Sequence, residues 1–314
     1  MTEFDLIRQY FDRGPPRHAE LGIGDDGALL RDRAGMSRVI VTDMLVGGRH
    51  FLADVDPASL GHKALAVNLS DLAAMGARPQ AFTLAIALPG VDADWLGAFC
   101  RGMFALADAS GCELIGGDTT RGPLCLSITA IGEVPQGAAL RRDHAQPGDD
   151  VWVSGALGGA AAALAALLES PGSLSAAARH RLDWPQPRLA LGQALRHLAS
   201  AAIDVSDGLL ADLGHVAERS RIGIELRADL VPLDPALSAL DPRQALGHAL
   251  GGGDDYELAF TAPAENRLAI EALGRSLELA LTRIGSAGGG RGVSVVDARG
   301  RPLADLARGF DHFG

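Results

Sequence analysis

The sequence predicts an α/β (α+β) protein with two domains, and three observations support this fold class. The chain has 314 residues, which is enough for about two domains of ordinary size. Hydrophobic residues make up 47% of the chain and charged residues 21%, a composition that excludes a disordered protein. Segments with helical periodicity and segments with strand character alternate from one end of the chain to the other.

The N-terminal half is expected to contain three helices and four strands. Thr2 can cap the first helix, and Gly14-Pro15-Pro16 ends it. Asp56 and Pro57 provide an N-cap and a first-turn proline for the second helix, which Gly76 stops. The strands are short apolar runs, several of them rich in β-branched residues. The predicted helices are 3–13, 57–75 and 94–109, and the predicted strands are 39–41, 81–88, 113–115 and 124–131.

A turn-forming segment, Pro147-Gly148-Asp149-Asp150, interrupts this pattern, and a new strand begins at Val151. We place the domain boundary here, which gives predicted domains of residues 1–147 and 148–314. The second half resumes with an alanine-rich helix and then alternates helices and strands again. Its predicted helices are 160–168, one that ends before 201, and 207–219, and its predicted strands are 151–153, 223–226, 257–261 and 293–296.

The charge balance and the cysteine usage exclude several classes of protein. Lys and Arg number 28 and Asp and Glu 39, so the net charge is −11, and such a surface repels nucleic-acid phosphates. The longest apolar run, 156–168, has 13 residues including two glycines, too few to cross a membrane. The three cysteines are widely spaced, and the first residues lack a signal-peptide pattern. We therefore expect a reduced, cytoplasmic protein without nucleic-acid or membrane partners.

Acidic residues recur where the predicted strands give way to glycine-rich turns. Asp43 follows the strand 39–41, Asp118 follows Gly116-Gly117, and Asp254 follows three glycines. Carboxylates gathered at one end of a sheet repel one another unless a cation neutralises them, and oxygen ligands without His or Cys suit Mg²⁺. Asp71 is unusual because it lies in an otherwise apolar helical run. The alternative is that each Asp-Gly pair is ordinary turn chemistry and that Asp71 faces water.

Three other motifs suggest a dinucleotide site, a phosphate-binding loop and a serine nucleophile, but none of them has the sequence context that such a site requires. Residues 22–27 match the Gly-x-Gly-x-x-Gly pattern, but no hydrophobic strand precedes them, which argues against a dinucleotide site. Lys63 is the only lysine, and it lacks the glycines of a phosphate-binding loop. Ser206 lies between Asp204 and Asp207, but no Gly-x-Ser-x-Gly motif is present, so its hydroxyl fits a cap or a metal site better than a nucleophile.

Taken together, the segments resemble the thiamine-monophosphate kinase family, which belongs to the superfamily of aminoimidazole ribonucleotide synthetase. The resemblance runs from Gly22 to Phe313, nearly the whole chain. Its most specific pieces are Asn-Leu-Ser-Asp-Leu-Ala-Ala-Met-Gly at 68–76, Gly-Gly-Asp-Thr-Thr-Arg-Gly-Pro at 116–123 and Gly-Phe-Asp-His-Phe at 309–313. Two positions depart from the family pattern: Val41 stands where Ser is frequent, and Asp254 stands where Glu is frequent.

The resemblance implies ATP-dependent phosphorylation of thiamine monophosphate to thiamine diphosphate by a homodimer. It implies that domain 1–147 binds ATP and metal and dimerises, and that the α+β domain 148–314 completes the active site. The implied Mg²⁺ ligands are Asp26, Thr42, Asp43, Asp71, Asp118, Asp204 and Asp207. The implied ATP contacts are Gly117, Asp118, Arg142 and Ser206, and the implied substrate contacts are His50, Asp254 and Phe310.

Elementary electrostatics agrees with this assignment. A triphosphate donor and a phosphate acceptor together carry about five or six negative charges near pH 7. Several Mg²⁺ ions on a carboxylate cage can neutralise them, and Arg142 adds a fork of donors. We expect direct in-line transfer without a catalytic side chain, because a phosphate monoester is already a nucleophile. The alternatives are another ATP-dependent synthetase of the same superfamily and a non-enzymatic acidic metal-binding protein.

Overall fold

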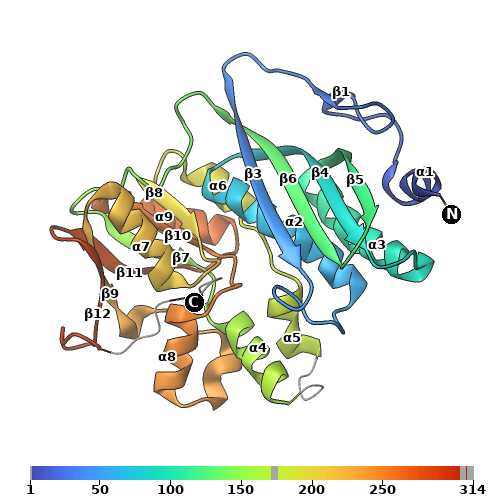
Figure 1. Ribbon diagram of the computed structural model, residues 1–314. Coiled ribbons are helices and arrows are strands. Elements are labelled where there is room, and N and C mark those ends of the chain that lie inside the picture. Colours follow the sequence, from blue (N-terminus) through green and yellow to red (C-terminus); the bar gives the residue numbers. More distant parts are fainter. Residues whose placement is uncertain (1, 171–175, 305–308, 310–314) are drawn as a thin grey trace. The chain divides into compact units, whose positions relative to one another are not determined.

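A computed structural model describes residues 2–170, 176–304 and 309 of the chain (Figure 1). Its helices and sheets confirm the predicted α/β (α+β) class. The internal contacts define two compact units, each with its own sheet. The first unit comprises Met1–Leu72 and Ala77–Gly137, and the second comprises Ala73–Gly76 and Ala138–Gly314.

The first unit is built on a four-stranded sheet with the order β3-β6-β4-β5. The pair β4 and β5 is parallel, and the other neighbouring strands are antiparallel. The two edge strands are therefore β3 and β5, with two strands between them. The bounds are β3 (Met36–Val46), β4 (Arg78–Leu88), β5 (Glu113–Arg121) and β6 (Cys125–Pro135).

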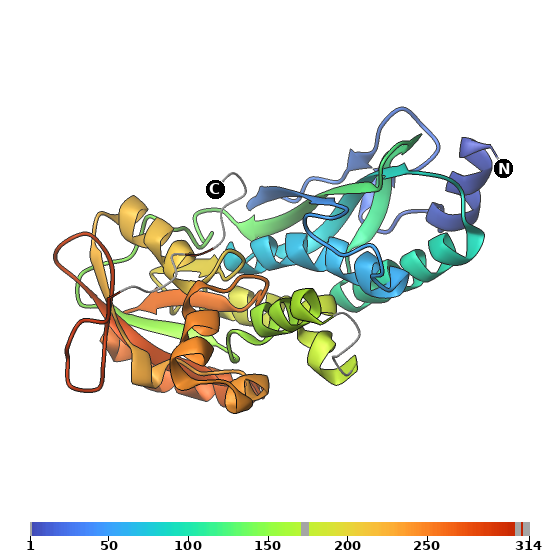
Figure 2. The same ribbon diagram turned by 60° about the horizontal axis from the view of Figure 1, so that its bottom comes forward.

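Two long helices, α2 (Pro57–Ala74) and α3 (Ala93–Ser110), cover one face of this sheet (Figure 2). They touch closely at glycine: a Cβ added to Gly102 would lie 1.8 Å from the carbonyl oxygen of Ala58. Between Ser59 and Leu72, every residue of α2 is buried except Asp71. The sequence correctly predicted both helices, because proline at the first position of α2 and a left-handed Gly111 after α3 are strong boundary signals.

The opposite face of the sheet carries apolar side chains of β3 on its surface. Side chains alternate along a strand, so Val39 and Leu45 are buried, whereas Ile40, Met44 and Val46 are 66%, 55% and 37% exposed. Three exposed apolar side chains on one strand form a patch of the kind that partners cover.

The N-terminal segment forms short elements beside this sheet. Thr2 and Asp5 cap each other: the Asp5 N–H donates to Thr2 Oγ1 at 3.2 Å, and the Thr2 N–H donates to Asp5 Oδ2 at 3.1 Å. The predicted helix 3–13 is wrong at its end, because the helical turns stop at Phe11, before Gly14-Pro15-Pro16. The elements are α1 (Glu3–Leu6), the π-helical turn η1 (Ile7–Phe11), β1 (Ala19–Leu21) and β2 (Leu29–Leu30).

Two predicted strand ends in the first unit are also wrong. Strand β3 continues through Asp43 to Val46, and β5 continues through Gly116-Gly117-Asp118 to Arg121. Asp and Gly are turn residues by local preference, but here the neighbouring strands β6 and β4 supply hydrogen-bond partners along the whole segment. Asp43 and Asp118 therefore lie inside strands and not in the turns that follow them.

The second unit contains a six-stranded sheet with the order β12-β9-β11-β7-β10-β8. Only the pair β9 and β12 is parallel among these strands. Both faces of the sheet are buried, because alternate residues of β7 enter different cores: Val151 and Val153 join one cluster, and Trp152 joins the other. The strands are β7 (Asp150–Ser154), β8 (Ala201–Asp204), β9 (Gly223–Arg227), β10 (Leu258–Ala262), β11 (Leu281–Gly288) and β12 (Gly292–Val296).

Helices follow most of these strands, and the sequence missed several of them. The predicted helices 160–168 and 207–219 are confirmed as α4 and α7, and the helix expected before residue 201 is α6. The helices α5, α8 and α9 and the strand β11 were not predicted. The bounds are α4 (Gly159–Glu169), α5 (Ala176–Asp183), α6 (Leu189–Leu195), α7 (Leu209–Ser220), α8 (Pro242–Gly251) and α9 (Arg267–Ser276), with 3₁₀ turns η2 (Ala228–Leu230), η3 (Pro235–Ala239) and η4 (Ala264–Asn266).

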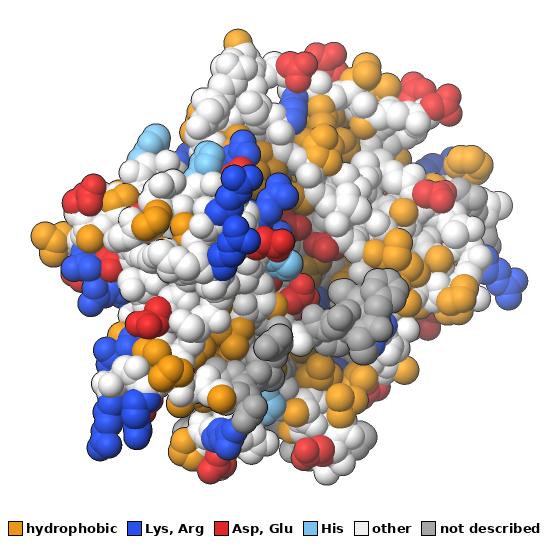
Figure 3. Space-filling view, turned by 60° about the vertical axis from the view of Figure 1, so that its left-hand side comes forward, with side chains coloured by type: hydrophobic (Ala, Val, Ile, Leu, Met, Phe, Trp, Pro, Cys, Tyr) orange, Lys and Arg blue, Asp and Glu red, His pale blue; other side chains and the backbone are white. Residues whose placement is uncertain are grey.

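The surface mixes charges of both signs despite the net charge of −11. On the face shown in Figure 3, basic side chains lie close to acidic ones. Among the helices of the described residues, none is both long enough and apolar enough to cross a lipid bilayer.

Candidate functional site

Helix α2 links two of the predicted metal ligands in the first unit. The backbone N–H of Asp43 in β3 donates to Oδ1 of Asn68 at 3.1 Å, and the Asn68 amide donates to the Ala64 carbonyl at 3.1 Å. Asn68 is fully buried, so these bonds fix its orientation. Asp71 lies three residues further along α2 and so on the same side of the helix. The buried amide thus holds β3 against the helical face that carries Asp71.

The predicted ligands Thr42 and Asp118 lie on the other face of the sheet. Thr42 Oγ1 lies 2.9 Å from Thr129 Oγ1 on β6, and both face away from α2. Asp118 is exposed and pairs in register with Ala85, which is exposed on the same face. Gly117 has a φ of 153°, and a Cβ there would lie 1.9 Å from the Leu84 carbonyl oxygen, so only glycine fits before Asp118.

The register of the sheet shows how far apart these acids are. Met44 of β3 pairs with Ser127 of β6, Ser127 with Ala85 of β4, and Ala85 with Asp118 of β5. Three strand spacings of about 4.8 Å separate the two edges by roughly 14 Å. Among the described residues, no three His, Cys, Asp or Glu side chains lie close enough together to hold a metal ion. The Mg²⁺ cage therefore stays a prediction.

Asp26 lies in a loop that starts next to β5. It is exposed in the loop between β1 and β2, and its backbone N–H donates to Asp25 Oδ1 at 2.9 Å. The loop begins at Gly22, where an added Cβ would lie 3.7 Å from the Ile115 carbonyl oxygen of β5. The loop that carries Asp26 thus starts beside β5, the strand of Asp118, whereas Asp43 and Asp71 belong to the β3 side of the sheet.

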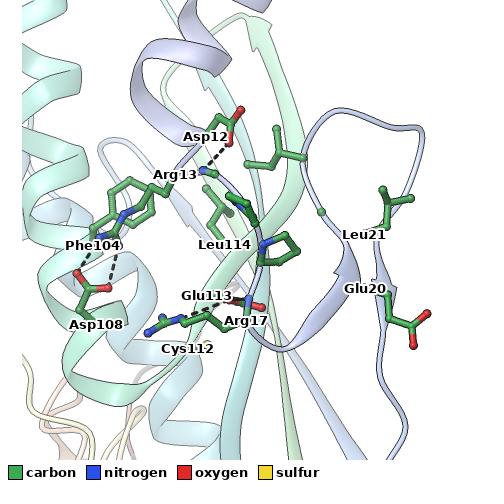
Figure 4. A pocket seen from close by; sticks show the side chains of 15 residues that line it. Asp12, Arg13, Arg17, Glu20, Leu21, Phe104, Asp108, Cys112, Glu113 and Leu114 are labelled. Atoms are coloured by element: carbon green, nitrogen blue, oxygen red, sulfur yellow. Dashed lines mark hydrogen bonds and ion pairs between the residues drawn. The ribbon is translucent and has the colours of Figure 1, made fainter.

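A pocket of about 510 Å³ lies beneath the start of this loop (Figure 4). Four of its charged side chains form two ion pairs: Arg13 Nη1 contacts Asp108 Oδ1 at 2.8 Å, and Arg17 Nε lies 3.6 Å from Glu113 Oε2. Arg13 also lies over the Phe104 ring, 4.7 Å from its centroid. Burial acts to raise the pKa of Glu113, but the backbone N–H groups of residues 17–19 outweigh it and lower the pKa.

His50 follows the end of β3, close in sequence to Asp43. Its ring atom Nδ1 accepts a hydrogen bond from the backbone N–H of Val46 at 2.9 Å, and the backbone N–H of His50 donates to the Val46 carbonyl at 3.0 Å. Because Nδ1 accepts, the neutral ring carries its proton on Nε2. This loop holds the imidazole in one tautomer, which suits the predicted contact with a phosphorylated substrate.

In the second unit, a single carboxylate organises the loop that follows β8. Asp212 Oδ2 accepts hydrogen bonds from the backbone N–H groups of Ser206, Asp207 and Gly208, each at 3.1 Å. Asp212 is 3% exposed. Burial, and then the nearby carboxylates of Asp204 and Asp207, raise the pKa of Asp212 to about 8. The predicted site residues Ser206 and Asp207 therefore lie in one ordered loop, directly after Asp204 at the end of β8.

The segment 251–257 packs directly on this loop. The Asp254 N–H donates to the Ser206 carbonyl at 2.9 Å, and the Tyr256 N–H donates to the Val205 carbonyl at 2.8 Å. Gly253 is required at this contact, because an added Cβ would lie 2.3 Å from the Ser206 carbonyl oxygen. The structure thus places the predicted substrate residue Asp254 beside the predicted nucleotide residue Ser206.

The last residue of this segment, Glu257, is held by buried ion pairs. Glu257 is 1% exposed, forms a two-pronged ion pair with Arg188 and accepts from Ser154 Oγ at 2.6 Å. Gly155 has a φ of 62° and lies so close that an added Cβ would be 2.1 Å from Glu257 Oε1. Removing Arg188 would leave this buried carboxylate with only the more distant Arg181, whose Nη1 lies 3.8 Å from Glu257 Oε1, and that loss is costly.

The remaining predicted site residues are Arg142 and Phe310. Arg142 is exposed, and its carbonyl accepts from Ser220 Oγ at 2.8 Å. The carbonyl of the preceding Arg141 accepts from the Ala202 N–H at 3.3 Å, which ties the Arg142 segment to β8 and so to the strand that ends at Asp204. Phe310 lies outside the described residues.

Sequence reasoning missed three residues that organise these groups: Asn68, Asp212 and Tyr256. Asn68 lies within the Asn-Leu-Ser-Asp motif and could have been flagged as a polar residue in an apolar helix. Asp212 lies in the first turn of α7, where an acid can accept backbone N–H groups. Tyr256 gave no local signal, because its role depends on the fold of the loop.

Comparison with known proteins agrees with this arrangement. The chain matches the family model "AIR synthase related protein, N-terminal domain" over residues 24–134 and "AIR synthase related protein, C-terminal domain" over residues 146–298. It is 47% identical to thiamine-monophosphate kinase of Salmonella typhimurium, over 99% of this chain and 98% of that protein. It is 46% identical to thiamine-monophosphate kinase of Escherichia coli K12, with the same two coverages of 99% and 98%.

Solved structures lead to the same family. The crystal structure of thiamine-monophosphate kinase from Stenotrophomonas maltophilia K279a has a TM-score of 0.88 and 49% identity, covering 96% of this chain and 98% of that one. A structure described as AaThiL complexed with AMPPCP and TMP has a TM-score of 0.79 and 31% identity, covering 90% and 89%. The family resemblance of the motifs is thus confirmed, and the chain belongs to the thiamine-monophosphate kinase family of AIR synthase related proteins.

Proposed function

We propose that this protein transfers a phosphoryl group from ATP to thiamine monophosphate and so forms thiamine diphosphate. The observation that carries the proposal is the hydrogen bond of 2.9 Å between the Asp254 N–H and the Ser206 carbonyl. It brings the residues that the family assigns to acceptor and donor onto adjoining loops. Phosphoryl transfer requires that donor and acceptor be held in line, and adjoining loops supply that positioning.

The residues present suit Mg²⁺ ions. Asp43 with Asp71, and Asp204 with Asp207, offer carboxylate oxygens without His or Cys among them, which is the donor set that Mg²⁺ prefers. Burial is the main cause of the raised pKa of Asp212, and the neighbouring carboxylates of Asp204 and Asp207, which a cation would stabilise, raise it further. When bound, Mg²⁺ supplies neutralisation of the phosphate oxygens.

The chain itself then binds and orients the substrates. Asp212 fixes the loop of Ser206 through three backbone N–H groups, and Asp254 on the adjoining loop contacts the acceptor. The acceptor phosphate is a nucleophile near pH 7, so no side chain needs to carry the phosphoryl group. Transfer in a single in-line step inverts the configuration at phosphorus.

The active site also requires a homodimer in this proposal. The family assigns Asp43 and Asp118 to one metal cluster, yet two strands and both faces of a sheet separate them in a single chain. The apolar surface of β3, formed by Ile40, Met44 and Val46, gives a second copy a face to cover. In the dimer, the β3 edge of one subunit and the β5 edge of the other form one site. A cytoplasmic location suits such an ATP-consuming enzyme.

Product analysis tests the proposed function. The protein is incubated with ATP, MgCl₂ and thiamine monophosphate, and the products are separated by chromatography. We expect ADP and thiamine diphosphate in equal amounts, and no thiamine diphosphate when EDTA is in excess. Release of ADP without thiamine diphosphate, but with turnover of another acceptor from a panel of superfamily substrates, would assign the chain to a different synthetase.

A further inference from the structure

Two bulky residues of the segment 251–257 adopt an unusual backbone conformation. Asp254 has a φ of 68° and Tyr256 a φ of 50°, in the left-handed region that aromatic residues rarely occupy. Such conformations persist where the surrounding structure imposes them, and they concentrate at functional sites. The two side chains are hydrogen-bonded to each other: Tyr256 Oη donates to Asp254 Oδ1 at 2.9 Å.

The surrounding protein fixes both ends of this contact. The backbone N–H groups of Asp254 and Tyr256 are bound to the carbonyls of Ser206 and Val205. The Tyr256 residue is 8% exposed, so its ring is packed into the protein and the hydroxyl has a defined position. The left-handed turns at both residues direct their side chains toward each other across Asp255. The hydroxyl therefore acts on the Asp254 carboxylate from a rigid support.

We propose that Tyr256 is a positioning residue that sets the orientation of the Asp254 carboxylate toward the heterocyclic cation of the acceptor. The inference rests on the proposed function, in which Asp254 contacts thiamine monophosphate. A carboxylate pairs with a cationic heterocycle such as the thiazolium ring of the acceptor. Aspartate is shorter than the glutamate frequent in the family, so its contact depends more on a fixed side-chain direction.

A double-mutant cycle distinguishes positioning from simple packing. Tyr256→Phe removes only the hydroxyl and keeps the packed ring. We expect it to raise the KM for thiamine monophosphate about tenfold, as loss of a hydrogen bond to a charged group does. The KM for ATP should stay within about twofold, since the backbone bonds to Ser206 and Val205 remain. Asp254→Ala should raise the same KM, and adding Tyr256→Phe to it should cause no further increase.

Tyr10, the other tyrosine of the chain, provides a matched control. Tyr10 Oη donates to the Ala93 carbonyl at 3.3 Å in the first unit, so Tyr10→Phe makes the same chemical change away from Asp254 in the sequence. It should leave both KM values unchanged. Calorimetric titration of thiamine monophosphate into enzyme with Mg²⁺ and a non-hydrolysable ATP analogue gives a readout that does not depend on turnover.

The outcomes are distinct. A raised KM and Kd for thiamine monophosphate in Tyr256→Phe, without addition in the double variant, supports the positioning role. Effects of Tyr256→Phe and Asp254→Ala that multiply, or equal losses for both substrates with a lower melting temperature, overturn it. So does an unchanged KM in Asp254→Ala. Failure of the proposed function is separate, since the unaltered protein would then form no thiamine diphosphate.

Discussion

The backbone N–H of Asp254 donates to the carbonyl oxygen of Ser206 at 2.9 Å, so the loops after β8 and α8 share a hydrogen bond at the candidate site. The contact is possible because Gly253 has no side chain. A displacement of one loop must therefore move the other, and a change at this contact is expected to affect ATP and thiamine monophosphate together.

Gly253→Ala tests this coupling. The new Cβ would lie 2.3 Å from the Ser206 carbonyl oxygen, so the loops must separate. We expect kcat/KM to fall about a hundredfold, with higher KM values for both substrates, because misplacement by about an ångström has that effect. Steady-state kinetics with each substrate varied in turn measures the change.

Gly247→Ala is the control for this substitution. Gly247 lies in α8, and an added Cβ would meet nothing within 4 Å. Alanine in a helix should stabilise the fold by about 0.5–1 kcal/mol and leave kinetics unchanged. Normal KM values in Gly253→Ala would contradict the coupling of the two loops.

Removal of the Asp212 carboxylate should loosen the Ser206 loop. Asp212→Ala leaves three backbone N–H groups without their acceptor. We expect the dissociation constant of an ATP analogue to rise at least tenfold, whereas Asp212→Asn, which keeps one carbonyl oxygen, should have a smaller effect. Fluorescence titration with a labelled nucleotide measures both.

Asp150→Asn is a suitable comparison for the Asp212 variants. Asp150 is also 3% exposed in the second unit, but it pairs with Arg267 and Arg283. Its loss should lower the melting temperature without changing nucleotide affinity. Equal nucleotide affinity in Asp212→Ala and the unaltered protein would show that the loop does not depend on this carboxylate.

Mixed dimers test whether one site is shared between subunits. Asp43→Asn and Asp118→Asn should each reduce turnover by two to three orders of magnitude or more, an estimate of about 3–4 kcal/mol for a lost transition-state partner. Dimers formed from both variants contain one site in which both aspartates are intact. Statistical mixing should then restore about a quarter of the unaltered activity.

Two controls accompany the mixed dimers. Each variant mixed with itself should stay inactive, and a mixture of Asp43→Asn with Asp71→Asn should also stay inactive, because both residues lie at the β3 edge. Absence of recovery in the mixture of Asp43→Asn and Asp118→Asn, with heterodimers demonstrated by mass spectrometry, would contradict the shared site.

The sequence predicted well what local chemistry determines. Helix α2 could be placed because Pro57 and Gly76 mark its ends, and Asp71 stood out there because its neighbours are apolar. The strand positions of Asp43 and Asp118 could not be predicted, because local preference for turns yields to hydrogen bonds from β6 and β4. The order of strands, which separates these acids, depends on long-range pairing that residue patterns do not encode.

Prediction from local sequence meets the same limit at the candidate site of the second unit. The acids at 204, 207 and 254 were predicted as site residues from motif and resemblance alone. Tyr256 adopts its left-handed conformation where its N–H binds the carbonyl of Val205, about fifty residues away in the chain, so no local pattern signals it. Side chains that position other residues are harder to find than those that touch a ligand.

The stability of the second unit should depend on pH through Asp255. This carboxylate accepts from the Gly158 N–H at 2.8 Å, and removal from water raises its pKa to about 8. Glu257 acts in the same direction, whereas Arg181 opposes it and is itself shared with Asp234.

The sign follows from the proton that the folded state retains. In the unfolded chain Asp255 ionises near the ordinary aspartate pKa of 3.8, so between about pH 4 and pH 8 the folded state holds a proton that the unfolded state has released. The free energy of unfolding therefore falls as pH rises through this window, by at most about 1.4 kcal/mol per pH unit, and levels off above pH 8.

Asp255→Asn removes this dependence. Its stability relative to the unaltered protein, measured by urea unfolding at pH 5, 6, 7 and 8, should increase with pH. Asp212 titrates in both proteins, so its contribution cancels in the difference. Stability curves that run parallel from pH 5 to pH 8 would contradict a protonated Asp255, and a variant that loses relative stability as pH rises would reverse the sign of the argument.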